Sequence, residues 1–259
     1  MSFLILAIAL GIFALPLVTA PLPGAGRITA SGFDGTGVVI GFVITVAVSA
    51  LTSPLFGIGF VLAVLLHEYG SALACRFIGH EVARVRLVPL PYLSGPRSDR
   101  AFDHALEESF AALYAPALAI VPMVLAFGLF HALAPHAPGI ANLMRILAIM
   151  LGTFNFIMLL PFLPFGGGRV VHAVSDAFWP QLSPIVTVFM SAAFASAALR
   201  DHSIAMGILA AAGFQSLLHR HRPKQARLSP NQALLVMAAY AFTLTVHFTG
   251  GYWLLTGLI

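Results

Sequence analysis

The chain is short of charge, and this shortage excludes most classes of soluble protein. Only 8% of its 259 residues are Asp, Glu, Lys or Arg, whereas 59% are hydrophobic. A soluble domain carries roughly 25% charged residues, and a disordered chain is poor in apolar ones. The mean hydropathy of +0.96 therefore predicts an all-α polytopic membrane protein.

Cysteine is almost absent as well. Cys75 is the sole cysteine, which excludes an internal disulfide framework and a cysteine-rich metal site. The first apolar segment lacks the basic residues that open a secretory signal peptide, although Val18-Thr19-Ala20 resembles a cleavage site. We therefore expect this segment to be a retained membrane helix.

Long apolar runs are what the sequence has in abundance. With some help from flanking residues, eight of them are long enough to cross a hydrocarbon core of roughly 30 Å. They lie at 3–20, 37–51, 58–77, 110–133, 140–163, 184–199, 203–218 and 233–255. The sequence predicts a bundle of about eight transmembrane helices.

The basic residues predict how these helices are oriented. If the loop after Phe77 is cytoplasmic, eleven Lys and Arg residues lie inside, and only Arg145 and Arg200 lie outside. Both termini and the 134–139 connection then face away from the cytoplasm. The basic loop 218–230 is expected to contact lipid headgroups, and the net charge of +4 reflects this topology, not nucleic-acid binding. We expect the protein in a bacterial inner membrane.

One short segment alternates with the period of a strand. Residues 82–87 alternate apolar and polar positions, which places Arg84 and Arg86 on one face. The turn-forming residues Pro89, Pro91, Gly95 and Pro96 then end it. Such a strand could bind an extended peptide at its edge.

An ionisable pair, His67 and Glu68, lies inside the third apolar run. In a His-Glu-x-x-His helix the two histidines share one face and bind one zinc ion, while the glutamate polarises the zinc-bound water. Here Ser71 occupies the position of the second histidine. Zinc binding would explain why a membrane helix carries a charged group, which is costly there. With Ser71 in place of the second histidine, this explanation no longer applies.

Three blocks of sequence, in order, carry a resemblance to a known family. Residues 67–79 begin His67-Glu68-Tyr69-Gly70 and are similar to a His-Glu-x-Gly-His helix, and residues 82–95 resemble a membrane-associated strand with a turn rich in Pro and Gly. Residues 159–169, Leu-Leu-Pro-Phe-Leu-Pro-Phe-Gly-Gly-Gly-Arg, are similar to Asn-Leu-Leu-Pro-x-Pro-x-Leu-Asp-Gly-Gly-Arg, and residues 110–117 resemble an Ala-Gly-Pro helix start. The chain therefore resembles the site-2 protease family of intramembrane zinc metalloproteases.

The resemblance implies three parts and a degenerate zinc site. The parts are N-terminal helices at 1–57, a site-2-protease-like core at 58–174 and C-terminal helices at 175–259. His67 matches the first zinc ligand and Glu68 the catalytic base, but Ser71 and Gly166 stand at the other two ligand positions. Met158 replaces a substrate-binding asparagine, with Asn155 one helical turn earlier.

Substitute ligands and partners have to be considered. His172 and Asp176 are spaced i, i+4 and could complete a site with His67, although a plain interfacial helix face ending near Trp179 explains them more simply. Cys75 lies two turns, roughly 12 Å, beyond His67, which is too far to share one ion. Without a metal, Glu68 should be protonated, hydrogen-bonded or paired with a base such as His67 or Arg169. A functional carboxylate and a polar packing contact both remain open.

Three functions are compatible with these residues. The first is a protein with a decayed zinc site that binds transmembrane segments of partner proteins, with Asn155, Arg84 and Arg86 contacting the segment and little or no zinc bound. The second is an active zinc endopeptidase with atypical ligands, in which Glu68 activates water. The third is a small transporter or channel whose Gly166-Gly167-Gly168 break lines a polar pathway. A serine mechanism at Ser71 is disfavoured because a regular helix offers no oxyanion site.

Overall fold

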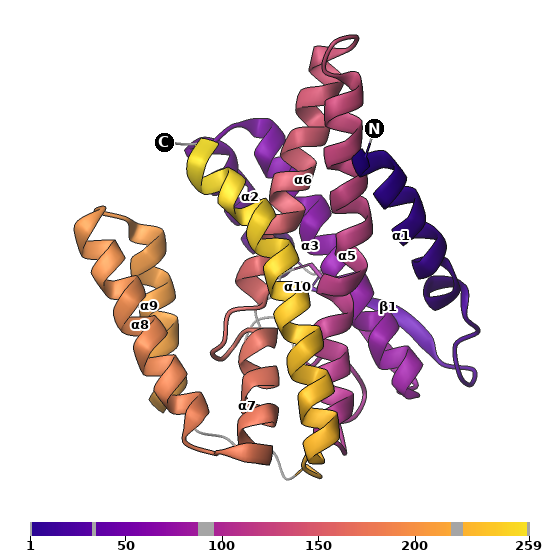
Figure 1. Ribbon diagram of the computed structural model, residues 1–259, viewed down its shortest axis with the longest axis vertical. Coiled ribbons are helices and arrows are strands. Elements are labelled where there is room, and N and C mark those ends of the chain that lie inside the picture. The colour runs from indigo at the N-terminus through magenta and orange to yellow at the C-terminus, as the bar shows by residue number, and fades with distance from the viewer. Residues whose placement is uncertain (1, 33–34, 88–95, 219–224, 258–259) are drawn as a thin grey trace. The chain divides into compact units, whose positions relative to one another are not determined.

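The computed structural model describes residues 2–32, 35–87, 96–218 and 225–257. The chain forms two compact units, and each is described by itself. The first unit comprises Met1–Ala101, Tyr114–Phe156 and Thr243–Ile259, and the second comprises Phe102–Leu113 and Ile157–Phe242. Helices make up most of both units (Figure 1).

The helices occupy all eight segments in which the sequence predicts them. In chain order the elements are α1 (Ser2–Thr19), β1 (Arg27–Ser31), α2 (Gly35–Leu51), α3 (Pro54–Ile78), β2 (Val82–Arg86), α5 (Ala105–Leu133), α6 (Pro138–Met158), α7 (Gly166–Phe178), α8 (Leu182–Arg200), α9 (Ile204–Leu218) and α10 (Pro230–Gly257). Within the described residues, five helices are long and apolar enough to cross a membrane, namely α3, α5, α6, α8 and α10. The protein is thus a mostly helical integral membrane protein, and eight spans remain a prediction because α1, α2 and α9 are shorter apolar helices.

The ends of α3 follow from its sequence. Pro54 occupies the first turn, where its missing N–H costs nothing. Gly79 ends the helix with a φ of 96°, a left-handed conformation that a glycine adopts without strain. The backbone N–H groups of Gly79 and His80 donate to the carbonyls of Arg76 and Cys75, which satisfies two carbonyls of the last turn. The chain is thereby turned sharply into β2.

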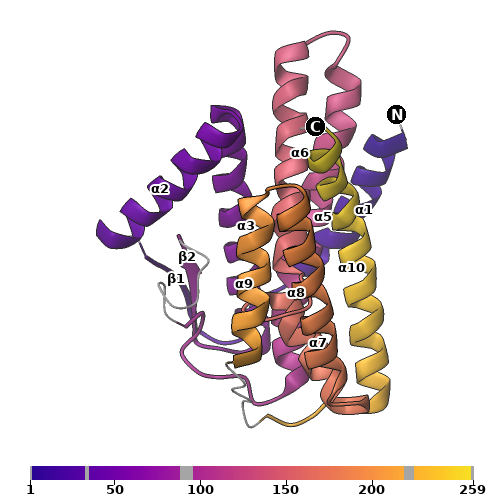
Figure 2. The same cartoon turned by 90° about the vertical axis from the view of Figure 1, so that its left-hand side faces the viewer.

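The predicted strand forms as β2, but its neighbours were not predicted. β2 pairs in parallel with β1, with Ser31 opposite Arg86, and the two strands lie side by side in Figure 2. On its other side, Arg84 donates to the Arg97 carbonyl at 2.8 Å and Asp99 donates to the Val82 carbonyl at 3.1 Å. β2 therefore has neighbours on both sides, so edge binding of a peptide at this part of β2 was a wrong expectation. The predicted turn residues Pro89, Pro91 and Gly95 lie outside the described residues.

The glycine-rich start of α7 has a packing role in the second unit. Gly167 and Gly168 are buried directly against the backbone of residues 159–163, where a Cβ atom would collide with main-chain atoms. α7 ends at Phe178, immediately before Trp179, as the sequence predicts. α8 and α9 then form a helical hairpin, and the two helices lie side by side in both views (Figures 1 and 2). The basic residues 219–224 of the following loop lie outside the described residues.

Candidate functional site

Glu68 is the centre of a buried ion-pair cluster in the first unit. Its side chain is 0% exposed. Arg86 donates from Nε to Oε2 at 2.9 Å and from Nη2 to Oε1 at 3.0 Å, which is a bidentate pair. Arg97 donates from Nη2 to the same Oε1 at 2.8 Å. One carboxylate therefore accepts three charge-assisted hydrogen bonds from two guanidinium groups.

The reversal of the chain after α3 brings these arginines to Glu68. Glu68 precedes the helix end at Ile78 by ten residues, a rise of about 15 Å. β2 contacts α3, and its four steps from Val82 to Arg86 cover about 13 Å. The end of β2 thus reaches back to the level of Glu68. Polar backbone at such a depth in a membrane protein has to be hydrogen-bonded within the protein, and β1 and residues 97–99 provide that pairing to β2.

The partners of Glu68 differ from those expected. The sequence suggested His67 or Arg169 as its base, whereas the ion pairs are made by Arg86 and Arg97. Arg169 belongs to the second unit, where it pairs with Glu108 at 3.8 Å. The physical reason is the return of β2 and residues 97–99 along α3, which places two nearby cations against the carboxylate.

His67 is held by Asn155 from α6. The Nδ2 group of Asn155 donates to the Leu151 carbonyl at 2.9 Å, so its Oδ1 faces His67 Nδ1 as an acceptor at 2.8 Å. His67 Nδ1 is then the donor of this hydrogen bond, which makes Nε2 the unprotonated nitrogen when the ring is neutral. The Phe154 ring supports the imidazole edge to face, with centroids 5.4 Å apart. This arrangement fixes the orientation of the His67 ring, as second-layer hydrogen bonds do for histidines that bind metals in other proteins.

The other predicted ligand positions are distributed over both units. Ser71 lies one turn after His67 and is 1% exposed, and its hydroxyl has no partner among the described residues. Gly166 begins α7 in the second unit, where a Cβ atom would meet the Ala112 and Met158 carbonyl oxygens at 3.4 Å. His172 and Asp176 lie on the same helix. In the part of the chain that the structure describes, no group of three His, Cys, Asp or Glu side chains is placed to hold a metal ion.

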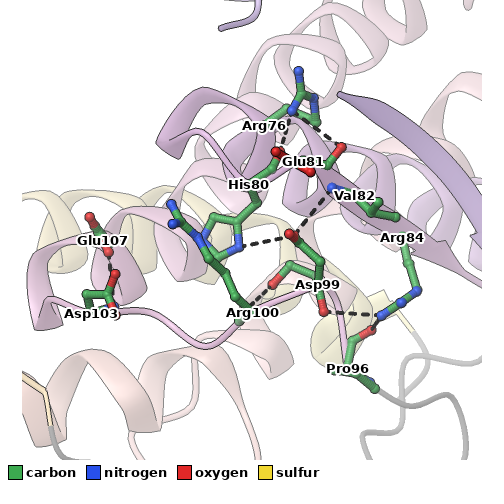
Figure 3. A network of polar contacts seen from close by, with 11 residues as sticks. Arg76, His80, Glu81, Val82, Arg84, Pro96, Asp99, Arg100, Asp103 and Glu107 are labelled. Atoms are coloured by element: carbon green, nitrogen blue, oxygen red, sulfur yellow. Dashed lines mark hydrogen bonds and ion pairs between the residues drawn. The ribbon is translucent and has the colours of Figure 1, made fainter. Parts of the chain in front are cut away.

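A second polar cluster fixes the loops around β2, and Figure 3 shows its members. Arg76, in the last turn of α3, donates to the carbonyls of His80 and Glu81 and, at 2.7 Å, to that of Pro23 before β1. Arg84 donates to the Pro96 and Ser98 carbonyls at 3.1 Å each. Arg84 thus stabilises the return of the chain, while Arg86 of the same strand pairs with Glu68.

Asp99, in the segment 97–99 that lies beside β2, is an acidic member of this cluster. Its Oδ1 accepts the Val82 N–H at 3.3 Å and lies 3.8 Å from His80 Nδ1. Desolvation works to raise the pKa of Asp99, but hydrogen bonds from its own and the Val82 backbone and the attraction of His80 outweigh it, so the pKa lies below its ordinary value. The ionised carboxylate therefore helps to hold residues 97–99 against β2.

Sequence reasoning missed Arg97, Arg76 and His80 as members of these clusters. Arg97 is separated from Glu68 by 29 residues and Arg76 from Pro23 by 53, so no helical or strand spacing links them. An available signal was the burial cost of arginine inside an apolar helix, which predicts that Arg76 must find acceptors.

Comparison of the chain with protein-family models, with curated proteins and with solved structures finds no match.

Proposed function

We propose that the chain is a site-2-protease-like protein of a bacterial inner membrane that binds transmembrane segments of partner proteins without cleaving them. The observation that carries this proposal is the state of Glu68, whose two oxygens already accept three guanidinium hydrogen bonds. A general base must be free to accept a proton from the attacking water. At Glu68, proton uptake would break ion pairs with two buried cations.

The ligand positions support the same proposal. A catalytic zinc site normally has three protein ligands and an open position. His67 offers one nitrogen, while a hydroxyl at Ser71 and a glycine at Gly166 offer no comparable donors. Two independent features therefore act against hydrolysis. Two ligand positions lack a metal-binding side chain, and Glu68 is already paired with arginines.

The sheet beside α3 supports the binding half of the proposal. β1 has β2 on one side, and no further strand pairs with it among the described residues. An extended part of a partner segment would therefore add to β1 instead of β2. A strand held beside a membrane helix suits a partner segment that has locally lost its helical hydrogen bonds.

One observation favours an active endopeptidase as the second candidate. Asn155 orients His67 with Nε2 unprotonated, which is the form that binds zinc. In this candidate His172 and Asp176 supply the missing ligands, and Glu68 must first lose its arginine partners. No observation on the fold favours a transporter, because Gly167 and Gly168 are explained by backbone packing.

Zinc content separates the two candidates. We expect less than about one zinc ion per ten molecules of purified protein, because losing two direct ligands costs more than the roughly 10–100-fold caused by losing an outer hydrogen bond. The double variant Ser71→His with Gly166→Asp should bind zinc, each single variant should bind it weakly, and His67→Ala in the double variant should abolish it. Near-stoichiometric zinc in the unmodified protein, lost in His172→Ala or Asp176→Ala, would overturn the proposal in favour of the endopeptidase.

Binding without cleavage is measured in phosphatidylcholine vesicles. The probe is a fluorescent 20-residue Leu/Ala peptide with Lys flanks and one central Gln, and energy transfer to the labelled protein reports binding. We expect saturable transfer and a peptide that mass spectrometry finds intact. Cleavage that disappears in Glu68→Gln would refute the proposal, and so would the absence of binding both by this peptide and by the same peptide with a central Glu.

A further inference from the structure

The Glu68 cluster contains more positive than negative charge. Arg86 binds both carboxylate oxygens, whereas Arg97 only shares Oε1 with it. Arg97 makes its ion pair with Glu68, and its Nε–H is buried without an acceptor in the described part of the chain. A buried donor without an acceptor is costly, and more so when it is charged. Arg97 is therefore the guanidinium whose binding capacity is incompletely used.

Arg97 is also the accessible member of the cluster. Its side chain is 16% exposed, compared with 3% for Arg86 and 0% for Glu68. Ser71, three residues after Glu68 on the same face of α3, adds a second buried donor without a partner. An acceptor that approaches Arg97 thus meets one unsatisfied donor on Arg97 itself, and Ser71 offers a second donor about one helical turn from Glu68.

The depth of the cluster decides what can supply that acceptor. Glu68 follows Pro54 by fourteen residues and precedes Ile78 by ten, so it lies near the middle of a membrane helix. Lipid phosphates lie at the membrane surfaces, about 15 Å from the centre of the hydrocarbon core. An acceptor at the depth of Glu68 has to be carried on a chain that itself enters the membrane. The segment 88–95, which precedes Arg97 in the sequence, carries no Asp or Glu and therefore has no carboxylate side chain to offer.

We propose that Arg97 recognises an acidic side chain, Asp or Glu, located near the middle of the partner's transmembrane segment. This inference rests on the proposed function and specifies its partner. The incoming carboxylate accepts from the Arg97 guanidinium, including the buried Nε–H, while Glu68 keeps its bidentate pair with Arg86. Both carboxylates are then matched by one arginine each, and the excess charge is removed. Intramembrane carboxylates are rare and costly for a free segment, so this pairing selects strongly among partners.

A matched pair of peptides tests the inference. The probes are the Lys-flanked Leu/Ala peptide with one central Gln and the same peptide with Glu in its place, each titrated against the full-length protein in phosphatidylcholine vesicles at neutral pH. We expect the Glu peptide to bind about 10–100-fold more tightly, the range of a hydrogen bond to a charged group. Arg97→Gln should remove this preference, because the one arginine that remains in the cluster, Arg86, is already paired with Glu68. Arg100→Gln, with the same change of charge at an exposed position three residues away, should keep it.

The Gln peptide separates a failure of the inference about Arg97 from a failure of the proposed function. Equal binding of both peptides by the unmodified protein would overturn the inference and leave the proposed function standing, whereas binding of neither would overturn the proposed function. A preference that survives in Arg97→Gln would also overturn the inference. If Arg97→Gln binds neither peptide because it is misfolded, the Arg97→Lys variant, which retains the charge, is tested instead. A preference of Arg97→Lys for the Glu peptide supports the inference, and loss of this preference refutes it.

Discussion

At the scale of single residues, the cluster around Glu68 is asymmetric. Removing the carboxylate leaves two buried guanidiniums facing each other, whereas removing Arg97 leaves a complete bidentate pair between Glu68 and Arg86. Breaking a buried ion pair by deleting one partner is costly because an uncompensated charge stays behind. The same three residues therefore contribute very differently to stability.

We expect Glu68→Gln to lower the free energy of unfolding by about 3–5 kcal/mol and Arg97→Gln to lower it by less than about 1 kcal/mol. Unfolding of the purified protein in detergent measures both values. Arg100→Gln is the control and should lie within about 0.5 kcal/mol of the unmodified protein. A Glu68→Gln variant as stable as the unmodified protein would show that the ion pairs do not form.

At the scale of the elements, the first unit is held by close contacts between helices. Gly152 of α6 faces Gly250 of α10, and a Cβ atom on Gly152 would lie 2.6 Å from the Gly250 Cα. Gly70 of α3 approaches α5 in the same way, with a Cβ position 2.9 Å from the Ala115 Cα. Buried His247 of α10 adds a polar contact at 2.8 Å to the Pro116 carbonyl of α5. Small residues at crossings and a few polar contacts are what hold membrane helices together.

Gly152→Ala should destabilise the protein by about 1–3 kcal/mol, because the added methyl meets backbone that cannot rotate away. Gly139→Ala on the same helix is the matched control, since a Cβ atom there meets nothing within 4 Å. The control should be neutral or more stable by up to about 1 kcal/mol, the usual gain of alanine over glycine in a helix. Thermal unfolding in detergent compares the two variants, and equal effects would contradict a close crossing of α6 and α10.

At the scale of the whole molecule, the distribution of basic residues predicts the orientation of the chain in the membrane. The connection between α5 and α6 carries no Lys or Arg, whereas the segment between α3 and α5 carries four Arg residues. Basic residues are retained on the cytoplasmic side. We therefore predict that β2 and the segment that carries Arg97 enter the membrane from the cytoplasmic side.

Cysteine labelling in intact cells tests this orientation. In a Cys75→Ala background, Arg100→Cys should react only after the membrane is permeabilised, while His136→Cys should react with an impermeant reagent in intact cells. Both positions are exposed, so accessibility depends on the side of the membrane. A Cys at Lys224, which lies outside the described residues, should behave like Arg100→Cys. Reversed labelling of Arg100→Cys and His136→Cys would refute the predicted topology.

The sequence by itself determined the helices, the strand β2 and the helix face that carries His67 and Ser71. These features depend on local patterns: apolar length for a membrane helix, alternation for a strand, and i, i+4 spacing for a helix face. It also placed Asn155 near the site through its position one turn before Met158. Only the tertiary structure decided the partners, because Asn155 meets His67 across 88 residues and Arg97 meets Glu68 across 29. Likewise the sequence pattern of β1 alternates polar and apolar residues over only five positions. Its parallel pairing with β2 joins segments about 55 residues apart, and no local pattern encodes such a distant partner.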